Sequence, residues 1–172
     1  MKTSVELSNE VQDWIRLAGL SVTQGSQTDD GRPIIWNKGG EIRYFVGVTD
    51  GYFVLTSSHR MGAENLHLAA VSTAILERYL VGHFGGSVRK SCGLQRVRKP
   101  FYRDELKSTY HLGAINFSGR EEDALMESTG SVLAIAAVDR LVELSHYIDV
   151  TIDTIKDSFL DPEGRPLFAQ PY

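Results

Sequence analysis

Two strand-like runs joined by Asp50-Gly51 constrain the fold of this chain more than any other feature. Residues 41–49 and 52–59 are rich in β-branched and aromatic side chains. Asp-Gly between such runs favours a two-residue hairpin turn, because both turn positions take positive φ. This turn sets the register, so that one face of the hairpin carries mostly apolar side chains. The opposed pairs on that face are Val48–Phe53, Val46–Leu55, Tyr44–Ser57 and Ile42–His59.

Further strands are predicted on both sides of this hairpin. Residues 34–36 come before it and residues 66–70 follow it, which indicates an antiparallel meander. Three more β-rich runs lie later in the chain, and the last two of them turn at Thr129-Gly130. These later runs are residues 112–117, 123–127 and 131–137.

Helical periodicity recurs near the start, the middle and the end of the chain. The first two helices begin at serine N-caps, and the second is predicted to end at Gly85-Gly86. The apolar stripe near the end of the chain predicts either one long helix or two helices joined near Asp149. The three helical regions are residues 8–18, 72–84 and 141–159. An antiparallel sheet covered by N-terminal, central and C-terminal helices is an α+β fold, and no repeat or linker divides residues 1–172, which indicates a single domain.

The composition narrows the class of protein. A net charge of −4 disfavours a nucleic-acid binder, which needs an excess of Lys and Arg to neutralise phosphates. The lone Cys92 excludes an internal disulfide and fits a reducing compartment. The most apolar stretch, residues 132–138, is too short to span a bilayer, and the N-terminus has no signal-peptide core. We therefore expect a cytoplasmic protein that does not enter membranes.

Motifs for catalysis or cofactor binding are not found. The five histidines form no metal-type pair, and a single cysteine cannot complete a zinc site of cysteine type. Gly85-Gly86-Ser87 follows a helix rather than a strand, which favours a helix end over a phosphate loop. Residues 121–123 are consecutive carboxylates and are interpreted as a solvated turn. The sequence thus predicts no catalytic residues, no cofactor and no metal.

A basic segment, residues 89–103, stands out in this acidic chain. Its cations lie beside Phe101 and Tyr102, a combination that could serve nucleic-acid stacking. Because the rest of the chain is acidic, a solvated loop or a docking surface for an acidic protein partner is favoured. The cations are Arg89, Lys90, Arg96, Arg98, Lys99 and Arg103.

The polar face of the hairpin also admits two interpretations. Its register places Arg43 across from Ser58 and Glu41 across from Arg60, close enough for the last two side chains to pair. An exposed ion pair of this kind would contribute about 0–1 kcal/mol. The alternative is a partner-binding patch continued by the loop of residues 60–65.

Several segments of the chain resemble a family of bacterial polymorphic-toxin immunity proteins. The resemblance is to the branch that contains the immunity factor for tuberculosis necrotizing toxin, a secreted toxin that hydrolyses NAD. The matching segments, in chain order, are residues 35–45, 50–52, 57–60, 77–80, 144–147 and 158–168. The family-motif positions among them include Trp36, Gly40, Glu41, Arg43, Tyr44 and Arg60.

The resemblance implies a cytoplasmic antitoxin that is not an enzyme. Its partner would be a cognate NAD glycohydrolase, bound one to one and inhibited by occlusion of the active-site cleft. From the residues we infer a toxin-binding surface, with Arg60 as its main anchor, formed by Lys38, Arg43, His59, Arg60, Met61 and Glu64. Two other functions stay open on the sequence: a secretion chaperone or adaptor, and a small enzyme that uses His59 or His111.

Overall fold

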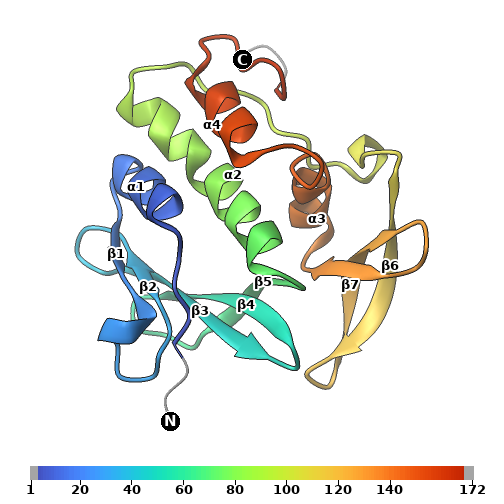
Figure 1. Cartoon of the computed structure of the whole chain (residues 1–172), viewed down its shortest axis with the longest axis horizontal. Coiled ribbons are helices and arrows are strands. Elements are labelled where there is room, and N and C mark those ends of the chain that lie inside the picture. The colour runs from blue at the N-terminus through green and yellow to red at the C-terminus, as the bar shows by residue number, and fades with distance from the viewer. Residues whose placement is uncertain (1–3, 169–172) are drawn as a thin grey trace.

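The computed structural model describes residues 4–168 and confirms the predicted α+β fold (Figure 1). The strands in this part of the chain form one antiparallel sheet. They are β1 (Ser21–Thr23), β2 (Ile34–Trp36), β3 (Ile42–Thr49), β4 (Tyr52–His59), β5 (Asn65–Ala70), β6 (Tyr110–Phe117), β7 (Arg120–Glu127) and β8 (Val132–Ile135). The α-helices are α1 (Asn9–Leu17), α2 (Thr73–Ser91), α3 (Val138–Ser145) and α4 (Ile152–Leu160), and short 3₁₀ turns η1 (Gly25–Gln27) and η2 (Arg103–Glu105) lie in the connections.

The sheet consists of two meanders with a narrow join. Its strand order is β1-β2-β3-β4-β5-β8-β7-β6. Strands β5 and β8 connect the meanders through only two residue pairs, Ala69–Ile135 and Ala70–Ala134. Figure 1 shows the helices gathered on one side of the sheet, with α2 running between α1 and α4. Within residues 4–168, no α-helix covers the opposite side of the sheet.

The predicted hairpin register is confirmed. Thr49 pairs with Tyr52 and Ile42 with His59, and the turn residues Asp50 and Gly51 have φ of 52° and 82°. The predicted apolar face points toward the helices, where its central pair Val46–Leu55 is completely buried. The turn chemistry was therefore sufficient to place these strands.

The predicted side-chain pair of Glu41 and Arg60 is wrong. Their contact is between backbones, because the Arg60 N–H donates to the Glu41 carbonyl at 2.7 Å. Arg60 has already left the strand, with φ of 51°. Among the described residues the ion pairs of this region involve other side chains.

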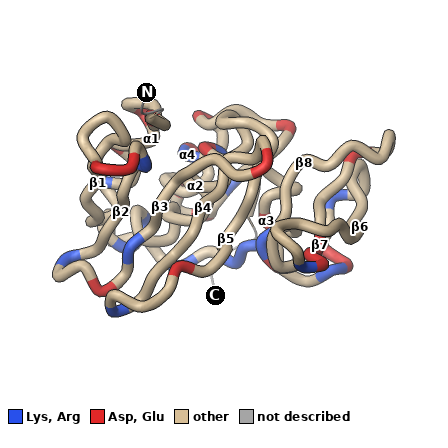
Figure 2. The backbone as a smooth tube through the Cα atoms, turned by 90° about the horizontal axis from the view of Figure 1, so that it is seen from below, with Lys and Arg blue, Asp and Glu red and all other residues tan. Residues whose placement is uncertain are grey.

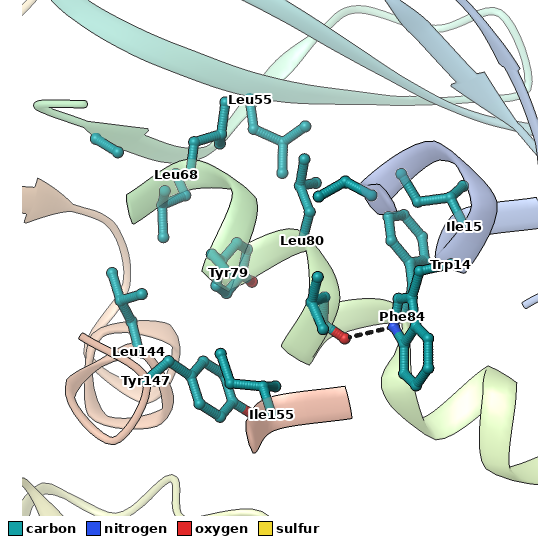
Figure 3. Close-up of a cluster of buried hydrophobic side chains, with 14 of the residues drawn as sticks. Trp14, Ile15, Leu55, Leu68, Tyr79, Leu80, Phe84, Leu144, Tyr147 and Ile155 are labelled. Atoms are coloured by element: carbon teal, nitrogen blue, oxygen red, sulfur yellow. Dashed lines mark hydrogen bonds between the residues drawn. The ribbon is translucent and has the colours of Figure 1, made fainter. Parts of the chain in front are cut away.

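The core lies between the helix-facing side of the sheet and α1, α2 and α4. Figure 3 shows Trp14 of α1 directed at α2, where its indole N–H donates to the Val81 carbonyl at 3.0 Å. Leu55 and Leu68 from the sheet, and Tyr147 and Ile155 from the C-terminal region, complete the same cluster. Segments from both ends of the chain thus share one hydrophobic core.

Helix α2 continues through the glycines that were predicted to end it. A Cβ on Gly85 would lie 2.4 Å from the Phe159 ring, and one on Gly82 would lie 2.1 Å from the Tyr147 ring. These glycines therefore allow α4 and the end of α3 to approach α2 closely. Packing against Tyr147 and Phe159, which lie 65 and 74 residues later in the chain, outweighs the weak helix propensity of glycine.

Two smaller differences from the prediction and one alternative that it left open concern other elements. Residues 121–123 lie inside β7 rather than in a turn, because Ser118-Gly119, with φ of 51° and 80°, makes the β6–β7 turn. Of the two alternatives left open for the C-terminal stripe, the structure has two helices, separated around Asp149. Strand β1 was not predicted, since its three residues carry little apolar pattern.

We expect Gly85→Ala to lower the free energy of unfolding by about 1–3 kcal/mol, because the added methyl group overlaps the Phe159 ring. The matched control is Gly86→Ala, one residue along the same helix, where a Cβ would meet no atom within 4 Å. The control should raise stability by about 0.5–1 kcal/mol through helix propensity. Urea denaturation followed by circular dichroism measures both, and equal effects would contradict the packing described.

Candidate functional site

Two loops converge at one end of the first meander. The β2–β3 turn and the β4–β5 loop are neighbours there, because β3 begins where β4 ends, with Ile42 paired to His59. Figure 2 shows both basic and acidic positions along these turns at its lower left. Five of the six predicted contact residues belong directly to these connections or to the strand ends beside them: Lys38, His59, Arg60, Met61 and Glu64.

The β4–β5 loop projects from the sheet in a tightly held conformation. Arg60 and Met61 are consecutive non-glycine residues in the left-handed region, with φ of 51° and 63°. The Ser58 hydroxyl donates to the Gly62 carbonyl at 2.7 Å, and the Gly62 N–H donates to the His59 carbonyl at 2.9 Å. The Met61 side chain is 72% exposed. The loop thus holds an apolar and a cationic side chain in water on a strained backbone, an arrangement that concentrates at functional sites.

The β2–β3 turn lies beside this loop and carries Lys38 at its exposed tip. Gly39 and Gly40 have φ of 86° and 68°, conformations that a side chain would strain. Arg43 folds back on the turn, its Nε donating to the Gly40 carbonyl at 3.3 Å. Trp36, paired across the strands with Arg43, is half-buried on the helix-free side of the sheet. A shallow hollow of about 520 Å³ lies here, lined by Thr23, Ile34, Trp36, Gly39, Gly40 and Arg43.

Glu64 is held by its own chain. Its carboxylate accepts hydrogen bonds from both terminal nitrogens of Arg32, at 2.6 and 3.1 Å, and from the Thr56 hydroxyl at 2.6 Å. Arg32 in turn pairs with Asp30 and covers the Phe45 ring at 4.6 Å. The Arg32 guanidinium lowers the pKa of Glu64. Glu64 therefore anchors the base of the β4–β5 loop to the sheet.

A cluster of histidines and tyrosines lies between β3, β5 and α2. Tyr44 shares a hydrogen bond with His83 at 3.1 Å, and His67 shares one with Tyr79 at 2.7 Å. Burial, assisted by the nearby Arg140 cation, lowers the pKa of His67 to about 4. Burial, with the neighbouring His67 and Lys99, lowers the pKa of His83 to about 3. These rings are neutral at physiological pH and serve packing, as does the motif residue Tyr44.

The basic segment is divided between the interior and the surface. Arg89 is only 1% exposed and donates to four backbone carbonyls, those of Gln95, Phe159, Asp161 and Pro162, at 2.6–3.1 Å. Its expected place on a surface loop is therefore wrong, since it binds the C-terminal end of α4, where a cation is favourable. Arg98 pairs with Glu105 and Lys99 with Glu143.

The remaining candidates for chemistry stay apart. His59 ends β4 and His111 lies in β6, which are separated in the sheet by β5, β8 and β7. No group of three or more His, Cys, Asp or Glu side chains in residues 4–168 could hold a metal ion. Cys92 is exposed at the end of α2. Within the same described range, the helices are too short or too polar to cross a membrane.

The fold thus places two loops of fixed conformation at one end of an antiparallel sheet. A family model described as immunity protein 61 matches residues 14–167, and the chain belongs to this family. It is thus an immunity protein, not an enzyme, and the resemblance seen in the sequence is confirmed.

Relatives and a solved structure agree with this membership. The chain is 54% identical over 169 residues to "Immunity factor for TNT" of Mycobacterium tuberculosis, covering 98% of this chain and 96% of that protein. A homolog of that factor in Mycobacterium bovis has the same identity and coverage. The solved structure of Rv3902c from M. tuberculosis superposes with a TM-score of 0.95 at 53% identity, covering 99% and 98% of the two chains.

We expect the buried histidines to make stability fall as pH is lowered from about 6.5. An unfolded histidine titrates near pH 6.5, whereas folded His67 does so at about 4, so the unfolded chain binds more protons between these values. Each such group costs up to about 1.4 kcal/mol per pH unit across this window. Unfolding free energies at pH 7 and pH 5 should therefore differ less in His67→Gln than in wild type. The control His111→Gln changes an exposed histidine and should keep the wild-type difference between pH 7 and pH 5. If His111→Gln reduces this difference and His67→Gln does not, buried His67 is not the cause of the pH dependence.

Proposed function

We propose that this protein neutralises a toxin that hydrolyses NAD, by binding it one to one in the cytoplasm and covering its NAD cleft. The partner is inferred from the relatives named as immunity factors for TNT, at 54% identity over nearly the whole of both chains. Similarity at this level along the entire chain supports a related toxin. Active-site occlusion, the one-to-one stoichiometry and the cytoplasmic location all go beyond family membership.

The projecting β4–β5 loop is the observation that supports occlusion of the toxin's active site. An inhibitor that enters a cleft needs side chains that stand out from its surface and lose little entropy on binding. Met61 and Arg60 stand out in this way, and the backbone under them is fixed by the Ser58–Gly62 and His59–Gly62 hydrogen bonds. Burying a pre-exposed methionine removes apolar surface from water without disturbing the core.

The neighbouring residues extend this loop into a surface. Lys38 and His59 are exposed on either side of it, and Arg43 supports the β2–β3 turn. Glu64 contributes indirectly, by tying the loop base to Arg32 and Thr56. Stable inhibitory interfaces bury on the order of 1,600 Å² in total, so the contact must spread from the loop over the adjacent strands. Such a contact would also include Trp36 and the hollow beside it.

Cellular NAD tests the function directly. Bacteria that express the cognate toxin domain should lose NAD, and co-expression of this protein should preserve it while the two purify as a one-to-one complex. If the two proteins bind but NAD is still lost, the protein is not an inhibitor of the toxin, and a role as an adaptor is favoured. Failure of the two proteins to bind would overturn the proposed partner.

We expect Arg60→Ala and Met61→Ala each to weaken toxin binding by about 2 kcal/mol, as truncation of an interface anchor does. Matched controls lie elsewhere on the sheet: Arg120→Ala removes an exposed arginine, and Val48→Ala removes an apolar side chain that is 55% exposed. The controls should change affinity by less than about 0.5 kcal/mol. Calorimetric titration measures all four variants.

The variant Glu64→Gln distinguishes a role of Glu64 in supporting the loop from direct contact with the toxin. If Glu64 acts through the loop base, this variant should weaken the Arg32 contact, raise loop mobility and lower affinity less than Arg60→Ala does. Unchanged affinity in both Arg60→Ala and Met61→Ala would show that the loop is not the inhibitory element.

A further inference from the structure

A second surface lies on the helical side of the molecule, away from the helix-free face of the sheet. A cleft of about 390 Å³ opens between α2, α3 and the segment of residues 96–101. Its apolar lining includes Val97, Pro100 and Phe159. The charged residues of the lining are Arg96, Arg98, Lys99, Asp139, Arg140 and Glu143. The volume lies in the range of ligand pockets and accommodates one large apolar side chain with its flanking backbone.

Two exposed aromatic rings stand on a fixed support at the mouth of this cleft. Phe101 and Tyr102 are 40% and 58% exposed, and their ring centroids are 4.3 Å apart. The Arg98 guanidinium lies 5.1 Å from the Phe101 ring centre and 5.7 Å from that of Tyr102. Glu105 holds Arg98 by two hydrogen bonds of 2.6 and 2.7 Å and also accepts from the Tyr102 N–H at 3.2 Å.

The ion pair of Arg98 and Glu105 holds the two exposed aromatic rings in fixed positions. The Arg98 guanidinium holds the pKa of Glu105 near 2, so the pair stays ionised at any physiological pH. Protein-binding surfaces are enriched in aromatic residues and arginine, which is the combination found here. Rings that are already positioned lose little entropy when a partner covers them.

Cations outnumber carboxylates in the lining of this cleft, where Arg96, Arg98, Lys99 and Arg140 stand against Asp139 and Glu143. Lys99 is occupied by Glu143 at 2.9 Å and by the Gly82 carbonyl at 3.1 Å. Arg96 and Arg103 are exposed, and neither forms an ion pair with another described residue. Figure 2 shows Lys and Arg positions gathered beside α3. A partner therefore meets a lining that is partly apolar and carries more cations than carboxylates.

We propose that this cleft and its aromatic rim bind an acidic peptide segment of a partner protein, with one apolar side chain inserted and carboxylates on either side. The partner's carboxylates would face Arg96 and Arg103, and its apolar side chain would enter beside Phe101. A small inorganic anion fits less well, because the lysine inside the cleft is already neutralised. Nucleic acid is disfavoured by the net charge of −4, because its binding depends on neutralising many phosphates.

Titration with a synthetic peptide tests this inference without any toxin, so its outcome is independent of the proposed immunity function. The probe is acetyl-Asp-Glu-Leu-Asp-Glu-amide, followed by amide chemical shifts of the isotope-labelled protein. Shifts should concentrate in residues 96–103 and around α3, and should weaken as salt is added. A peptide with lysine in place of each acidic residue is the matched negative probe.

Variants make the site assignment falsifiable. The pair Arg96→Glu with Arg103→Glu should weaken binding roughly tenfold or more, and Tyr102→Ala should weaken it at every salt concentration. Arg120→Glu introduces on β7 the charge change of one of these two substitutions and should leave binding unchanged. The inference is overturned if the acidic peptide shifts no residue of the cleft. It is also overturned if Arg120→Glu is as harmful as the cleft variants, or if oligothymidylate binds there more tightly than the peptide.

Discussion

Close packing around helix α2 is the constraint on which the rest of the structure depends. The helix contacts α1 through the Trp14–Val81 hydrogen bond, and it meets Tyr147 and Phe159 at two glycines that permit no side chain. Arg89, in its last turn, then fastens the end of α4 through backbone carbonyls. Because α2 lies against the sheet as well, these contacts turn two meanders with a two-pair join into one rigid body. A rigid scaffold is what allows short loops at its end to keep a fixed shape.

The parts of the fold that local chemistry determines were predictable. Asp50-Gly51 specified a hairpin and its register, and Ser8 and Ser72 marked where helices begin. The parts that depend on distant partners were not. Gly85 signals a helix end unless Phe159 is known to lie against it, and Arg89 looks like a surface cation until its acceptors, 70 residues later, are in place.

The candidate site shows the same division. Patterning located the loop after β4, and family resemblance singled out Arg60 within it. Sequence rules would assign positive φ to Gly62, whereas the structure places it at Arg60 and Met61 and uses Gly62 for a close approach to the His59 carbonyl. The role of Glu64 was missed because its partner, Arg32, lies in a segment without periodic pattern. Long-range ion pairs of this kind leave no local signal.

Hydrogen exchange of the protein alone and in complex with its toxin tests the central claim most directly, that the loop end of the first meander is the inhibitory surface. Complex formation should slow exchange at amides of residues 37–41 and 59–65, while amides at the Asp50-Gly51 turn, at the far end of the same hairpin, exchange as before. Protection confined to other surfaces, with these two loops unchanged in a complex that still blocks NAD hydrolysis, would contradict the account.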